Sequence, residues 1–113
     1  NVVKDKSLEF AVRIVNLYKF LVNEQKEFVM SKQILRSGTS IGANIREAEQ
    51  AQSRADFINK LNIALKEANE TEYWLELLIR TEYITREQYE SINNDSTEIN
   101  KLLISIIKTT KNN

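Results

Sequence analysis

Three glutamates, Glu47, Glu67 and Glu70, are the side chains of this sequence whose spacing could support acid–base or metal chemistry. Glu67 and Glu70 lie three residues apart in one predicted helix and so share a face, and Glu47 belongs to the helix before it. Helical bundles build di-metal sites from facing glutamates together with Glu-x-x-His units, but the chain contains no histidine. We therefore expect no metal, no cofactor and no enzymatic activity. The glutamates should bond to neighbouring side chains or face water.

A further polar set could bind a ligand or bridge a contact between helices. Its four members follow one another at spacings of three, four and three, which places them on one helix face: Ser37, Ser40, Asn44 and Glu47. Since buried polar groups usually exist to satisfy one another, we favour hydrogen bonding across a helix–helix or subunit contact over ligand binding.

The two glycines of the chain, Gly38 and Gly42, both fall inside this predicted helix, four residues apart. A glycine within a helix costs about 1 kcal/mol relative to alanine. The expected compensation is another backbone that approaches closely. We therefore predict that Gly38, Ile41 and Gly42 belong to a packing seam or an oligomer interface, together with the polar set.

The composition restricts the classes of protein to consider. Hydrophobic residues make up 42% of the 113 residues and charged residues 28%, which is ordinary for a globular protein. There is no cysteine, which excludes disulfides and thiolate chemistry. No apolar run reaches the roughly 18 residues of a membrane span, so we expect a cytoplasmic protein without a membrane partner.

Periodicity and capping signals predict four helices. Ser7 is the expected N-cap of the first, and Ser53 with Asp56 and Thr85 with Gln88 have the spacing of capping boxes ahead of the third and fourth. The expected ranges are 8–23, 31–51, 54–80 and 86–110.

The polar stretch 93–97 is rich in poor helix formers. We interpret it as an exposed turn of a continuous fourth helix, with a kink or break as the alternative. Short connections between long helices imply antiparallel neighbours. The sequence therefore predicts an all-α fold, an antiparallel up-down-up-down four-helix bundle that forms one domain over residues 1–113.

The first helix is apolar over more of its circumference than one core-facing side requires. One stripe consists of Phe10, Ile14, Leu17 and Leu21, and an adjoining one of Leu8, Ala11, Val15, Tyr18 and Val22. Either this helix is deeply buried or one stripe meets another subunit.

Charge gives one indication of a partner. The sixteen basic and sixteen acidic side chains cancel, whereas a dedicated nucleic-acid binder usually has a basic excess. The predicted topology nevertheless gathers several cations at one end of the bundle, where they could meet a phosphate backbone: Arg46, Arg54, Lys108 and Lys111. The alternative is that they complement helix dipoles and aid solubility, and we favour it.

Two segments together carry a family resemblance. The motif Ser40-Ile41-x-x-Asn44-Ile45-x-Glu47 and the stretch Ala55–Leu78 resemble the bacterial 23S rRNA intervening-sequence proteins. The resemblance covers nearly the whole chain, including its final hydrophobic stretch. It implies an antiparallel four-helix bundle that assembles into a homopentameric ring, with Asn44 and Glu47 as structural motif residues. The family has no established catalytic residues to carry over.

The resemblance also indicates a kind of partner. The accessory protein of diversity-generating retroelements looks related to this family, and it is a basic pentamer that binds nucleic acid and a reverse transcriptase. This chain differs in having no net charge. We therefore predict a non-enzymatic, self-assembling scaffold whose partner is RNA or a ribonucleoprotein by resemblance alone. The alternative is an RNA-binding protein that uses the basic bundle end.

Overall fold

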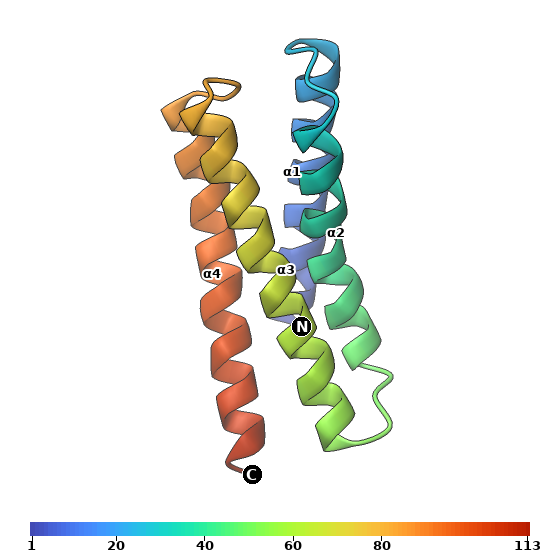
Figure 1. Ribbon diagram of the computed structural model, residues 1–113. Coiled ribbons are helices and arrows are strands. Elements are labelled where there is room, and N and C mark those ends of the chain that lie inside the picture. Colours follow the sequence, from blue (N-terminus) through green and yellow to red (C-terminus); the bar gives the residue numbers. More distant parts are fainter.

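Four helices and no strand make up the structure, a computed structural model that describes all 113 residues. The helices are α1 (Val2–Asn23), α2 (Met30–Ala48), α3 (Arg54–Arg80) and α4 (Arg86–Lys111). Consecutive helices run antiparallel in a bundle of 47 × 21 × 19 Å (Figure 1). Contacts join α1 to α2, α2 to α3, α3 to α4 and α4 back to α1. The predicted all-α, up-down-up-down architecture is confirmed.

The start predicted for the first helix was wrong. α1 begins at Val2, where the side chain of Asn1 accepts a hydrogen bond from the backbone N–H of Lys4 as the N-cap. Ser7, the predicted cap, lies inside the helix, is buried, and donates its hydroxyl to the carbonyl of Lys4 at 2.9 Å. The helix extends this far because Val3 adds a buried apolar side chain to its core-facing stripe.

The N-terminus of α2 is capped by a carboxylate that the sequence patterns did not reveal. Glu27 is 7% exposed and accepts hydrogen bonds from the backbone N–H groups of Val29, Met30 and Ser31 at 2.7 to 3.2 Å. Burial alone would raise the pKa of Glu27, but the three N–H donors outweigh it, so that the pKa is lowered. The helix consequently begins at Met30, one residue before the predicted start.

α2 ends at Ala48 rather than at residue 51. The backbone N–H groups of Glu49, Gln50 and Ala51 each bond to the carbonyl three residues earlier, which tightens and ends the helix. The chain then turns so that Ser53 becomes extended and caps α3, its side chain accepting from the N–H of Asp56 at 3.0 Å.

The last two helices follow the predicted signals. Thr85 and Gln88 form a reciprocal capping box at the start of α4. α4 is one helix through residues 93–97, because Ser96 faces inward, is buried, and donates to Glu72 of α3 at 3.2 Å. The alternative of a break in this helix is therefore not realised.

The core runs the length of the bundle between the four helices. It contains nineteen buried apolar residues. The two apolar stripes of α1 differ in how far they enter this core. The first stripe is buried throughout: Phe10, Ile14, Leu17 and Leu21. The second stripe is only partly buried, with Leu8 exposed, so it contributes less hydrophobic stabilisation to the isolated bundle.

Candidate interaction surfaces

The outer face of α1 is an apolar surface that the rest of the chain covers only in part. Leu8 and Val12, one helical turn apart, are 53% and 55% exposed. The residues that extend this face along the helix are half-buried: Ala11, Val15, Tyr18 and Val22. Single exposed apolar residues are common, but a continuous strip on one helix indicates a contact surface.

The two helical glycines lie against α1 of the same chain. A Cβ atom at Gly38 would come within 2.7 and 2.8 Å of the side chain of Ile14, so only glycine fits without displacing a core residue. A Cβ atom at Gly42 would lie 3.3 Å from the hydroxyl of Ser7 and 3.4 Å from its carbonyl oxygen. The structure therefore places this glycine seam between α1 and α2, inside the subunit.

Gly42 also lines a shallow hollow of about 260 Å³ between α1 and α2, together with Leu8, Ala11 and Arg46. Leu8 and Ala11 belong to the outer apolar face of α1. The seam and that face are thus adjacent, with Gly38 on the buried side and Gly42 near the surface.

The polar set of α2 makes local bonds rather than a ligand site. Ser40 donates to the carbonyl of Arg36 at 2.6 Å, and the Asn44 amide donates to the carbonyl of Ser40 at 2.9 Å. Ser37 is buried and its hydroxyl accepts from Thr71 of α3 at 2.9 Å. Glu47 is exposed, 3.8 Å from the ammonium of Lys60. Ser37 and Glu47 thus contact α3, whereas Ser40 and Asn44 bond within α2, and the four side chains do not converge on a common point.

The carboxylates considered for metal or acid–base chemistry are held by an arginine. The guanidinium of Arg36 donates to Glu67 at 3.1 Å and to Glu70 at 2.6 Å, and the indole of Trp74 donates to Glu70 at 3.0 Å. These bonds, from Trp74 first and Arg36 second, lower the pKa of Glu70. No group of three or more metal-ligating side chains occurs in the structure, and Glu47 stands apart from the pair.

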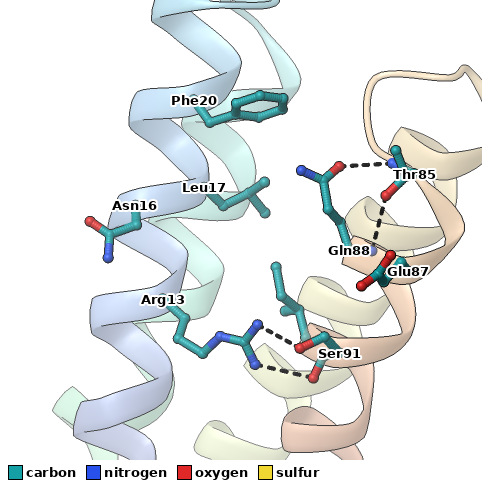
Figure 2. A pocket seen from close by; sticks show the side chains of 9 residues that line it. Arg13, Asn16, Leu17, Phe20, Thr85, Glu87, Gln88 and Ser91 are labelled. Atoms are coloured by element: carbon teal, nitrogen blue, oxygen red, sulfur yellow. Dashed lines mark hydrogen bonds between the residues drawn. The ribbon is translucent and has the colours of Figure 1, made fainter.

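A groove between α1 and α4 was not predicted from the sequence (Figure 2). It has a volume of about 670 Å³. At one end Arg13 crosses from α1 to α4, donating to the carbonyl and hydroxyl of Ser91 at 3.1 and 2.8 Å and to Asp95 at 2.6 Å. At the other end stands the capping box of α4, and the apolar lining between them consists of Leu17, Phe20 and Ile92.

The four cations proposed for phosphate contact are all exposed, and none takes part in an ion pair: Arg46, Arg54, Lys108 and Lys111. They do not line one common hollow. Arg46 lines the hollow between α1 and α2, whereas Lys108 and Lys111 line another, of about 400 Å³, between α3 and α4. Those two helix pairs form opposite sides of the bundle.

Comparison with known proteins places this architecture. The model of the 23S rRNA-intervening sequence protein family matches residues 1–105. The chain belongs to this family. A solved structure of a protein of unknown function, from the S23 ribosomal protein family of Bacteroides thetaiotaomicron VPI-5482, is 98% identical in sequence. The match covers 95% of this chain and 92% of that one, with a TM-score of 0.92. Among curated proteins there is no match.

The resemblance drawn from the motif of α2 and from residues 55–78 is thus confirmed. Membership in the 23S rRNA-intervening sequence protein family fixes the fold and leaves the role of each surface to be argued from its chemistry. None of the four helices is long and apolar enough to cross a membrane.

Proposed function

We propose that the protein is a non-enzymatic, self-assembling interaction protein whose subunits associate through the outer apolar face of α1. The assembly is a ring of five subunits, as the family resemblance implies. Such a ring uses two different surfaces of each subunit, in a head-to-tail contact. Its role is that of a scaffold, with RNA or a ribonucleoprotein as the partner class.

The observation that carries this proposal is the exposure of Leu8 and Val12 within the apolar strip of α1. Burying apolar surface is worth about 25 cal/mol per Å², so this strip would stabilise an assembly more than a lone bundle. The chemistry of the glutamates supports a role outside catalysis, because Glu67 and Glu70 are both paired with Arg36.

Native mass spectrometry of protein purified at low salt tests the proposal. We expect a mass of five subunits for the unaltered protein and a shift toward monomer for Val12→Glu, which places a charge in the strip. Asn59→Glu is the matched control, because Asn59 is an exposed residue of α3 and the substitution adds the same charge. A monomeric unaltered protein, or equal assembly of both variants, would contradict the proposal.

Direct RNA binding is the second candidate function. The four exposed cations without acidic partners favour it, since free Lys and Arg side chains can replace the counterions of a phosphate backbone. All four lie at the end of the bundle that holds the α2–α3 connection and the C-terminus (Figure 1), and an assembly would set these ends of its subunits side by side.

The salt dependence of RNA binding tests this second function. Each phosphate contact adds about 0.7 to the slope of log affinity against log salt for a single strand. Replacing Arg54, Lys108 and Lys111 by Gln should therefore weaken binding and reduce the slope by about 2. The control replaces three exposed lysines elsewhere on the surface: Lys19, Lys66 and Lys101. Equal losses in both triple variants would exclude the bundle end as the RNA site.

A further inference from the structure

We propose that the apolar tip of the α1–α2 loop, Phe28 and Val29, docks into the groove between α1 and α4 of a second copy of this chain. This inference rests on the proposed self-assembly and adds a tip and a groove to the contact made by the outer apolar face of α1. The occupant is a second copy because the exposed tip and the groove occur on the same chain, at the same end of the bundle, and carry opposite charges at their edges.

The tip is apolar, exposed and held in place. Phe28 is 53% and Val29 71% exposed, although both follow directly on the buried Glu27. The Glu27 carboxylate binds the backbone N–H groups of Val29, Met30 and Ser31, which fixes the backbone of the tip. A protruding segment that is already ordered loses little conformational entropy when it binds.

A second bond anchors the loop to the rest of the bundle. The side-chain amide of Gln25 donates to the carbonyl of Tyr83, in the α3–α4 loop, at 2.8 Å. The tip therefore has a fixed position relative to both helical hairpins. It resembles the rigid apolar anchors that dominate the energetics of protein interfaces.

The groove can accommodate such an anchor. Its volume of about 670 Å³ falls within the roughly 300–1,000 Å³ of well-formed ligand pockets. Leu17 and Ile92 form a floor that is almost fully buried, at 6% exposure each, with Phe20 beside them. The cation in this region, Arg13, is already bonded to α4 (Figure 2). An apolar side chain that enters the groove would therefore not leave an unpaired charge beside it.

The placement of tip and groove permits a closed assembly. The α1–α2 loop lies at the same end of the bundle as the start of α4, where the groove has its capping-box end (Figure 1). In a ring whose axis runs along the bundles, subunits meet at equal heights. A tip and a groove at the same end of the bundle satisfy this condition. Because they are two different surfaces, the contact between them is head-to-tail.

The charges around the two surfaces are complementary. Lys26 and Lys32 flank the tip, are exposed, and form no ion pair within the chain. Glu87, on the rim of the groove, is likewise exposed and unpaired. Opposite charges at the edge of an interface favour the correct partner and orientation.

Disulfide cross-linking tests the contact, because the chain contains no cysteine of its own. Lys32→Cys places a thiol beside the tip and leaves Phe28 and Val29 intact, and Asn16→Cys places one on the rim of the groove, where Asn16 is exposed and makes no hydrogen bond. Under mild oxidation the double variant should give a ladder of covalent oligomers, because every subunit donates one surface and accepts the other. Either single variant should give none beyond background, and Lys32→Cys with Asn59→Cys is the matched control.

Substitution of the tip gives a second measurement. Phe28→Ser with Val29→Ser should raise the dissociation constant of the assembly by at least about tenfold, with the helical circular dichroism of the subunit unchanged. An assembly that forms normally but yields no ladder and resists these substitutions would overturn the docking of the tip while leaving self-assembly intact. A subunit that stays monomeric in native mass spectrometry would overturn both. A ladder that appears equally with the Asn59→Cys control would show random collision and also count against the tip.

Discussion

α2 packs on its neighbours α1 and α3 in a different way from that in which α1 packs on α4. Along α2, a glycine lies directly against Ile14, a buried Ser37–Thr71 bond crosses to α3, and Arg36 binds two carboxylates. Between α1 and α4 there are two exposed ion pairs, from Arg13 to Asp95 and from Lys6 to Glu98, and a groove of about 670 Å³. The bundle is therefore tightly packed along α2 and more open between α1 and α4.

The largest expected difference between the two regions concerns cavity formation. Ile41→Ala, in the closed region, should destabilise the protein by about 2–5 kcal/mol, because Ile41 is fully buried and its removal leaves a void. Ile92→Ala removes the same atoms from the lining of the groove, where water can fill the space. It should lower the free energy of unfolding by clearly less. Urea unfolding of both variants measures the two values. Equal costs would mean that the groove is as tightly packed as the core.

The second effect sharpens the comparison within one helix. Gly38→Ala should destabilise by about 1–3 kcal/mol, since the new methyl group collides with the buried, branched side chain of Ile14. Gly42→Ala brings its methyl group only to 3.3 Å from Ser7, and the gain of about 1 kcal/mol in helix propensity offsets the crowding. Thermal melts should therefore separate the two variants. A Gly38→Ala variant whose melting temperature equals or exceeds that of the unaltered protein would contradict the close packing of α1 on α2.

A smaller effect compares the polar contacts of the two regions. Thr71→Val keeps the shape of the side chain but removes the bond from Thr71 to Ser37, and we expect a loss of about 1 kcal/mol. Arg13→Ala removes an ion pair whose side chains are 38% and 44% exposed, and exposed pairs contribute roughly 0.2–1 kcal/mol. Chemical denaturation should thus rank Thr71→Val as the more damaging. The reverse order would indicate that Arg13 is what holds α1 and α4 together.

The smallest effect is a pH dependence of the closed region. The pKa of Glu70 is lowered in the folded protein, by Trp74 first and by Arg36 second. Its contribution is therefore complete above the ordinary carboxyl pKa of 4.5 and is lost as the pH falls through the folded value. In Trp74→Phe, which lacks the indole N–H, the loss should begin at a higher pH. NMR titration of the Glu70 carboxyl in both proteins measures this, and identical titration curves would disprove the role of the indole.

Local signals allowed much of the fold to be predicted from the sequence. Ser53 with Asp56 and Thr85 with Gln88 are short-range pairs, and both caps occur as expected. The cap at Glu27 was missed because a buried carboxylate ahead of a helix resembles any surface glutamate in sequence. The start of α1 was missed because Ser7 matches a capping residue, whereas its burial depends on α2.

The candidate surfaces were harder to predict because they depend on distant residues. The helical glycines predicted that another segment packs closely on this helix, but only the structure identifies Ile14 as the neighbour of Gly38. The groove joins Leu17 to Ile92, which are far apart in the chain. Its existence depends on how closely the first and last helices pack, which no local pattern specifies.

The order in which the helices pair also bears on how the chain acquires its structure. Each helix packs on the next one along the sequence, and the pairing between the first and last is the sparse one. Folds dominated by contacts between sequence neighbours lose little loop entropy at each step and fold in microseconds to milliseconds. The first three helices can accordingly pack as they leave the ribosome, and α4 completes the bundle with little delay.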